Sequence, residues 1–257
     1  MLPPSLRASY EGRVATLELA RPEKRNALND ATVEGIAQFF AALPEEIGAV
    51  VICAQGPHFS AGLDLSTVSG IGLLDGIAKS RLWYRAFESI EFGRVPVVAV
   101  LHGAVVGGGL ELAAATHVRV AERSAYYGLP EGQRGIFVGG GGSVRIPRLI
   151  GTARMMDMML TGHVYDAEEG AAIGISQYLV EDGAGRAKGL EIAQMMASNS
   201  SMTNFAIMHA LPRIAESDPH TGYMLEALMA AVAVNDDEAK TRIEAFLSKR
   251  GPKVQPP

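Results

Sequence analysis

The 257-residue sequence has one cysteine, one tryptophan, few aromatic residues and no long hydrophobic run. A single cysteine excludes an intrachain disulfide and a zinc site built from several thiolates. This residue, Cys53, follows the apolar run 49–52, so we expect a buried structural thiol rather than a nucleophile. No apolar segment reaches the roughly 18 residues that a membrane span requires, and the first residues do not resemble a signal peptide. We therefore expect a cytoplasmic protein that does not enter membranes.

Basic stretches are absent as well, and the formal net charge is −5. The sequence has no Gly-x-Gly-x-x-Gly pattern after a strand, no Gly-Lys-Ser/Thr, no Gly-x-Ser-x-Gly and no His-Glu-x-x-His. The six histidines lack ligand spacing. Two of them, His102 and His117, lie in or beside apolar strands, where hydrogen-bonded core histidines are expected. These absences argue against a nucleic-acid partner, a metal site and a dinucleotide cofactor.

The apolar pattern predicts an α/β core. Residues 13–20 alternate as in a half-buried strand, and helical spacing then begins after a predicted N-cap at Asn29. The segments 49–54 and 95–102 are continuous and β-branched, which is typical of strands buried on both faces. A glycine run then opens a short helix between residues 107 and 120, and another strand begins at its end. Strand and helix therefore alternate along this part of the chain.

The later part of the chain reads as helix. A methionine-rich stripe with helical spacing is expected to face the core; it comprises Met155, Met156, Met159 and Leu160. After Gly183 we predict helices at 184–198, 203–215, 221–233 and 236–249, the last with Asn235 as N-cap. Their apolar faces need a packing partner, which predicts an oligomer interface. We divide the chain into a core domain, 1–195, and a helical oligomerisation region, 196–257.

Three glycine-bearing segments could carry chemistry: 56–65, 103–112 and 129–142. Each adjoins a predicted strand. Glycine permits positive φ and close backbone approach, so free N–H groups can point at a ligand oxygen. A tight turn accounts for any one segment alone, but the three together indicate an anion-binding site.

Two glutamates belong to these segments. Glu111 lies in the first turn of the predicted glycine-opened helix, where a surface carboxylate would pair with the helix N-terminus. Its neighbours are apolar, however, so we expect Glu111 to be buried and to need a functional reason. Glu131 follows Pro130 in a loop, and an exposed surface glutamate is an equally good interpretation there.

Four motifs occur together in an order and spacing that resemble the crotonase (enoyl-CoA hydratase/isomerase) superfamily: RNALN at 25–29, SAGLDL at 60–65, GGGLEL at 107–112 and PE at 130–131. The resemblance extends over nearly the whole chain. It implies the crotonase (ClpP/crotonase-like) fold, a spiral of β-β-α units forming two nearly perpendicular sheets, with a helical C-terminal trimerisation region. It also implies a homotrimer or a dimer of trimers.

The resemblance implies a reaction and its residues. The backbone N–H groups of Leu63 and Gly108 would form an oxyanion hole for the thioester oxygen, Glu111 would help activate water for attack at C3, and Glu131 would protonate C2. Gly139 resembles a hydratase-like glycine where certain dienoyl isomerases carry an aspartate. These residues favour hydration of 2-enoyl-CoA to 3-hydroxyacyl-CoA through a thioester enolate. The alternatives are an enoyl-CoA isomerase or another enolate-forming acyl-CoA enzyme, and a non-catalytic acyl-CoA-binding protein.

By the same resemblance, coenzyme A arrives as part of the acyl-CoA substrate and no separate cofactor is implied. Its pocket would comprise Arg25, Ala27, Ala61, Asp64 and Leu65, together with Phe246 and Lys249 near the C-terminus, commonly from a neighbouring subunit. A solvated helix end is the alternative for the last two. Residues 66–80 would line the acyl tunnel. One departure from the family is Arg134, which would favour the ionised form of Glu131 if the two paired.

Overall fold

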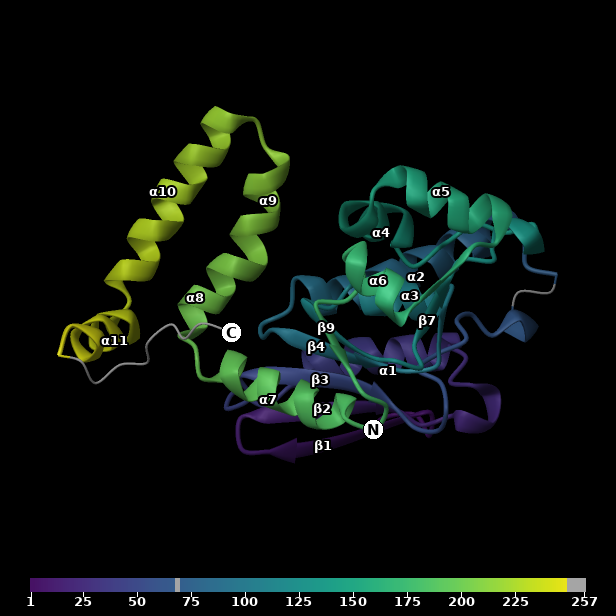
Figure 1. The fold of residues 1–257 in the computed structure, drawn as a ribbon, viewed down its shortest axis with the longest axis horizontal. Coiled ribbons are helices and arrows are strands. Elements are labelled where there is room, and N and C mark those ends of the chain that lie inside the picture. Colours follow the sequence, from purple (N-terminus) through teal and green to yellow (C-terminus); the bar gives the residue numbers. More distant parts are fainter. Residues whose placement is uncertain (68–69, 249–257) are drawn as a thin grey trace. The chain divides into compact units, whose positions relative to one another are not determined.

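The computed structural model describes residues 1–67 and 70–248, which divide into two compact units, Met1–Ala197 and Ser198–Pro257. In the first unit, strands and helices alternate along the chain (Figure 1). Its helices are α1 (Asp30–Ala41), α2 (Leu73–Glu91), α3 (Gly108–Ala114), α4 (Gly142–Ile150), α5 (Thr152–Thr161), α6 (Ala167–Ala172) and α7 (Gly185–Ala197), with short 3-10 turns at Pro22–Lys24, Leu65–Thr67 and Gly132–Arg134.

Two sheets organise this unit. The larger has six strands in the order β1 (Leu6–Glu11), β2 (Val14–Leu19), β3 (Ala49–Ala54), β4 (Val97–Leu101), β6 (Val118–Glu122) and β9 (Tyr178–Val180). Only β1 and β2 pair antiparallel in it. The smaller has the order β5 (Ala104–Val106), β7 (Tyr126–Gly128) and β8 (Val164–Asp166). Because β5 leads straight into α3, the smaller sheet sets the position of that helix.

The large sheet is buried on both faces, as the β-branched runs predict. On β3, Val50 and Ile52 pack into the cluster that contains the apolar faces of α1 and α2. The alternate residues Val51 and Cys53 pack with Ile192 of α7 on the other face. Side chains of successive strand residues point to opposite faces, so one strand serves both cores. Burial also raises the pKa of the Cys53 thiol to about 11, as expected of a structural thiol.

The methionine-rich stripe is only partly buried, which corrects one expectation. On α5, Met155 and Met158 are buried, whereas Met156 and Leu160 are exposed. A short helix lying on a core buries a narrow stripe, and the next residue in sequence turns about 100° away from it. The segment is helical as predicted, but the prediction that Met156 and Leu160 face the core is wrong.

The second unit is helical throughout its described part. It contains α8 (Ser201–Phe205), a π-helical turn (Ala206–Ala210), α9 (Leu211–Glu216), α10 (Pro219–Asn235) and α11 (Asp237–Leu247). Figure 1 shows α9 and α10 side by side, joined by a short turn. The predicted cap at Asn235 is wrong, because Asp236 accepts the Ala239 N–H at 3.2 Å while the Asn235 side chain donates to Ala231 O. The N-cap of α11 is thus Asp236, one residue later than predicted.

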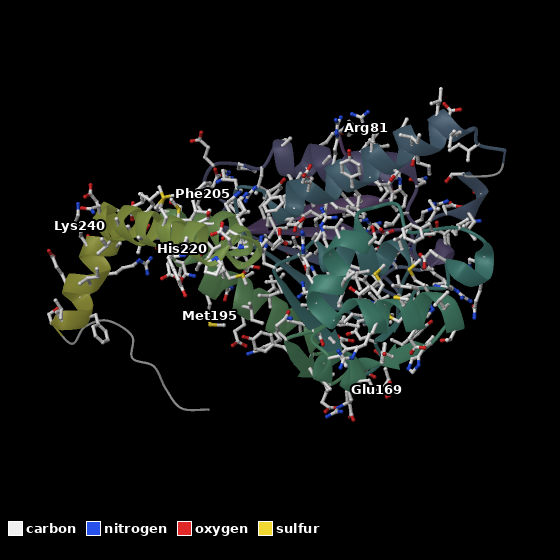
Figure 2. The ribbon with its side chains drawn as sticks, turned by 90° about the horizontal axis from the view of Figure 1, so that it is seen from above. Arg81, Glu169, Met195, Phe205, His220 and Lys240 are labelled. Atoms are coloured by element: carbon white, nitrogen blue, oxygen red, sulfur yellow. The ribbon has the colours of Figure 1, made fainter. Side chains whose placement is uncertain are left out.

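Many side chains of the second unit point outward, including the labelled Phe205, His220 and Lys240 (Figure 2). Along α10 only Gly222 is buried within the described residues, and Tyr223, Met224 and Leu228 are exposed. Across both units, the described part of the chain contains no helix long and apolar enough to cross a membrane.

Candidate active site

A cavity of about 370 Å³ lies in the first unit. It is bounded by the loop after Ser60, the first turns of α2 and α3, the loop after β7 and the glycine segment before α4. Its lining residues are Leu63, Ile71, Gly76, Lys79, Ser80, Trp83, Gly108, Glu111, Glu131 and residues 136–140. All three predicted glycine-bearing segments therefore contribute residues to one cavity, and both predicted glutamates line it.

Two backbone N–H groups at the cavity have no acceptor. The segment 61–64 is held against residue 28, because Leu28 N–H donates to Gly62 O at 2.7 Å and Asp64 N–H donates to Leu28 O at 2.8 Å. Neither of these bonds involves the N–H group of Leu63. Among the described residues, neither the Leu63 N–H nor the Gly108 N–H donates a hydrogen bond to the protein.

The two N–H groups also lie close together. A methyl group added at Gly62 would lie 2.9 Å from the Gly108 nitrogen, and one added at Gly108 would lie 3.3 Å from the Leu63 nitrogen. The α3 helix begins at Gly108, so its positive end adds to the field at this point. A negatively charged oxygen would find two hydrogen-bond donors here.

Glu111 is buried, with 3% of its surface exposed. Its Oε1 accepts the N–H groups of Gly140 and Gly142, both at 2.8 Å. Burial raises the pKa of Glu111, while the N–H groups of Gly142, Gly140 and Gly139 and the Arg145 cation act in the opposite direction. The first residue of α4, Gly142, is one of these donors, so the carboxylate caps that helix.

Glu131 is 6% exposed, and its Oε2 has no hydrogen-bond partner in the described part of the chain. Burial raises its pKa to about 7, and the charge of Glu111 adds to the increase. Arg134 opposes this shift, but its side chain is exposed and forms no ion pair with Glu131 among the described residues. The pairing considered from the sequence is therefore wrong, and Glu131 can hold a proton at neutral pH.

Gly107 lies between these groups, at the start of α3. Its φ is 53°, and a methyl group there would lie 2.7 Å from Glu131 Oε1. The glycine is needed both for its backbone conformation and for space. The Gly107 N–H donates to Gly128 O at 2.9 Å, which ties the helix start to the end of β7, three residues before Glu131.

The family model described as "Enoyl-CoA hydratase/isomerase" matches residues 9–256 of this chain. The chain belongs to the enoyl-CoA hydratase/isomerase family. Curated relatives include a probable enoyl-CoA hydratase of Bacillus subtilis, which is 32% identical over 249 residues, or 94% of this chain and 95% of the relative. Another is the short-chain-enoyl-CoA hydratase of Clostridium acetobutylicum, 29% identical, with 93% of each chain covered.

Solved structures of the enoyl-CoA hydratase/isomerase family confirm the predicted crotonase fold. A candidate enoyl-CoA hydratase from Rhodopseudomonas palustris is 56% identical, with a TM-score of 0.93 over 96% of this chain and 95% of that one. The enoyl-CoA hydratase from Bacillus anthracis is 28% identical, with a TM-score of 0.90 over 97% and 98%. The protein is thus an enzyme of this superfamily, and its substrate class is the acyl-CoA thioester.

In this family member, five of the residues predicted to bind coenzyme A are adjacent. Ala61 N–H donates to Arg25 O at 2.9 Å, which sets the segment 25–28 beside the segment 61–65. Ala27, Asp64 and Leu65 belong to these two segments, and Asp64 accepts a hydrogen bond from Arg21 at 2.9 Å. Phe246 lies in the second unit, 58% exposed, and Lys249 lies outside the described residues. Their contact with coenzyme A stays a prediction.

Sequence reasoning did not single out three polar or aromatic side chains around the cavity, although one of them, Lys79, lies in the segment 66–80 that was expected to line the acyl tunnel. Trp83 and Lys79 come from α2, and Arg145 from α4 supports the glycine segment by donating to Gly140 O at 2.9 Å. Two sequence signals could have pointed to these side chains. One is the position of the only tryptophan of the chain on an amphipathic helix, and the other is an arginine just after a glycine run.

The two histidines that lie in or beside apolar strands are hydrogen-bonded to backbone groups. His117 accepts the Val97 N–H at 3.0 Å, and His102 Nε2 lies 2.9 Å from Gly56 O, so both are hydrogen-bonded as expected, although both are half-buried rather than buried in the core. Within the ranges that the structure describes, no three His, Cys, Asp or Glu side chains gather as metal ligands.

Proposed function

We propose that the protein adds water to 2-enoyl-CoA esters and forms 3-hydroxyacyl-CoA. The observation that carries this proposal is the pair of buried carboxyl groups, Glu111 and Glu131, which line one cavity with two unpaired backbone N–H groups. One carboxyl group is held by N–H donors, and the other retains its proton near neutral pH. Addition of water needs both a base and an acid, and this pair supplies them.

The backbone donors would bind the thioester carbonyl oxygen. Attack of water at C3 moves the double-bond electrons toward C2 and the carbonyl, so negative charge develops on that oxygen. The N–H groups of Leu63 and Gly108 are positioned to stabilise this charge, and one such donor contributes roughly 2.7–4 kcal/mol. Both are backbone groups, so the side chain at residue 63 is free to serve the cavity wall.

Glu111 and Glu131 would divide the proton transfers. Ionised Glu111 takes a proton from the water as its oxygen bonds to C3, and protonated Glu131 gives a proton to C2. General acids and bases contribute roughly 10²–10⁴-fold each. A pKa near 7 suits the donor, because the proton is present at neutral pH and is still readily released. After one turnover Glu111 holds a proton and Glu131 lacks one, so one proton must pass between them or through water.

Substrate binding would use the adjacent segments 25–28 and 61–65 for the coenzyme A moiety. A neighbouring subunit would supply Phe246 and Lys249 in a homotrimer or a dimer of trimers. The cavity itself would hold the enoyl group and the start of the acyl chain.

The test is the loss of conjugated enoyl-thioester absorbance when the purified protein meets a panel of 2-enoyl-CoA esters of short, long, branched and aromatic type. We expect rapid loss with at least one ester. In Glu131→Gln, kcat should fall by about 10²–10⁴-fold while the ester still binds, because only the proton donor is removed. The matched control is Glu46→Gln, an exposed glutamate, which should leave kcat unchanged.

Three results would contradict the proposal in different ways. Unchanged turnover in Glu131→Gln would remove that residue from the mechanism. A gain of conjugated absorbance with 3-enoyl-CoA esters, without any loss with 2-enoyl esters, would identify an isomerase. Tight ester binding without turnover of either substrate would identify an acyl-CoA-binding protein.

A further inference from the structure

Lys79 is a cation in the wall of the acyl cavity. It lies on α2, lines the cavity with Leu63 and Glu131, and has only 11% of its side chain exposed. Its ammonium donates to Asp30 Oδ1. An ammonium has three N–H donors. Asp30 is the only hydrogen-bond acceptor of Lys79 among the described residues, so two donors have no protein acceptor and are left to water in the cavity.

Asp30 forms an ion pair with Lys79 and neutralises its charge. Its side chain is 45% exposed, at the start of α1, and it also accepts the Trp83 Nε1–H at 2.9 Å. The Lys79 ammonium lies 5.8 Å from the centre of the Trp83 ring. The pair is thus neutral as a whole, and Lys79 is the member that lines the cavity.

Lys79 lies where the acyl chain of a bound ester would pass. The Trp83 ring lies against Gly108, because a methyl group added there would lie 2.9 Å from a ring carbon. Trp83 therefore borders the point where the thioester oxygen would bind. Lys79 precedes it by four residues, which is one helical turn or about 5.4 Å along α2. A substituent a few carbons beyond the enoyl group would come within reach of the ammonium.

An apolar acyl chain would remove water from the free donors of Lys79 without replacing it. Unsatisfied buried donors are costly, whereas a hydrogen bond to a charged group is stronger than one between neutral groups. We propose that Lys79 makes the cavity selective for acyl groups that carry a neutral hydrogen-bond acceptor, a hydroxyl or carbonyl oxygen, a few carbons beyond C3. This inference rests on the proposed function in placing the acyl chain in the cavity.

A neutral oxygen fits the charges better than a carboxylate. Asp30 already neutralises Lys79, and Glu111 and Glu131 line the same cavity. A second anion would therefore meet a neutral pair and two acidic groups rather than an unpaired cation.

A purely structural role for Lys79 makes a different prediction. If the lysine only holds Asp30 and Trp83 in place, its loss will affect apolar and oxygenated esters alike. The test therefore compares binding of saturated esters, which can be neither hydrated nor isomerised. The probes are hexanoyl-CoA, its derivatives with a hydroxyl or oxo group at C4, C5 or C6, and adipoyl-CoA for the carboxylate, measured by titration calorimetry with the full chain.

For the unaltered protein we expect at least one neutral oxygenated ester to bind about tenfold tighter than hexanoyl-CoA. Lys79→Met should abolish this preference and change hexanoyl-CoA binding by less than about threefold. Asp30→Asn leaves the lysine charge in place and should preserve the preference. Lys188→Met, which removes an ion-paired lysine on α7, is the matched control and should have no effect.

Three results would overturn the inference: hexanoyl-CoA binding as tightly as every oxygenated ester, adipoyl-CoA binding best, or Lys79→Met weakening all esters equally. Should the methionine variant not fold, Lys79→Arg, which keeps donors at this position, must retain the preference. Normal ester binding without hydration of any 2-enoyl ester would refute the proposed function while leaving the binding preference intact.

Discussion

Glu131 combines burial with an unpartnered oxygen, and both features would suit the proton donor of the proposed reaction. Burial raises its pKa to about 7, whereas an exposed glutamate would lose its proton near 4.5. The same burial opposes folding whenever the group is ionised. The burial that keeps a proton on Glu131 near neutral pH therefore lowers stability above neutral pH.

Glu131→Gln should stabilise the protein at alkaline pH. Between pH 4.5 and 7 the folded state binds more protons than the unfolded state, so wild-type stability falls as pH rises through this window, and the loss is complete above pH 7. Glutamine does not ionise. The variant should therefore gain up to roughly 3 kcal/mol at pH 8, and the gain should vanish below pH 4.5. Urea unfolding at pH 4, 6 and 8 measures it; a gain independent of pH would contradict the burial argument.

The sequence alone indicated Glu111 and Glu131 but not their partners. The apolar neighbours of Glu111 predicted its burial, because a carboxylate among such residues has no solvated face. Its donors, Gly140 and Gly142, are about 30 positions away and depend on tertiary packing. The misjudged pairing of Glu131 with Arg134 has the same origin, since three residues of separation do not fix side-chain direction in a loop.

Arg145, near the start of α4, holds the glycine segment that binds Glu111. Arg145 donates to Gly140 O at 2.9 Å and to Glu91 Oε2 at 2.6 Å, and it is 8% exposed. Gly140 also donates to Glu111. The arginine thus fixes the backbone segment that holds the Glu111 carboxylate, without lining the cavity itself.

Arg145→Met should lower kcat by about 10–100-fold with little change in KM, because the carboxylate loses its fixed orientation. The Arg145 cation also lowers the pKa of Glu111, whereas burial raises it. Its removal should raise that pKa, so the loss of kcat on the acid side should begin at higher pH. Arg145→Lys keeps the charge and should keep the acid limb closer to wild type. An unchanged pH profile in Arg145→Met would reduce its role to stability.

The long, strongly patterned elements were the predictable ones. The strands at 49–54 and 95–102 and the helix after Asn29 are confirmed, since continuous β-branched runs and a capped apolar stripe are local signals. The three-residue strands β5, β7 and β8 exist only because their partners are adjacent in space, and no local pattern marks them. For this reason the second sheet could be anticipated only by family resemblance.

The second unit exposes apolar side chains that a single chain leaves uncovered. Tyr223, Met224 and Leu228 are exposed on α10, and large exposed apolar surfaces mark interaction sites. The homotrimer or dimer of trimers stays a prediction, as do the cytoplasmic location and the domain boundary at residue 195.

Leu228→Glu should convert the oligomer to smaller species, because a charge would be buried in the interface. Light scattering coupled to gel filtration measures the mass, with Glu226→Gln on the same helix as control. A monomeric wild-type protein would show that α10 is covered in another way. If Phe246 is shared between subunits, Leu228→Glu should also raise the KM for coenzyme A esters.

The hydrogen bond from Trp83 to Asp30 has a practical consequence. Trp83 is the only tryptophan in the sequence, its ring borders the cavity, and its indole N–H is held at 2.9 Å. All intrinsic indole fluorescence therefore originates at the wall of the cavity that is proposed to hold the acyl group. Emission intensity and wavelength should report ligand occupancy without any label, and stopped-flow mixing could separate ester binding from the chemical step in the native protein.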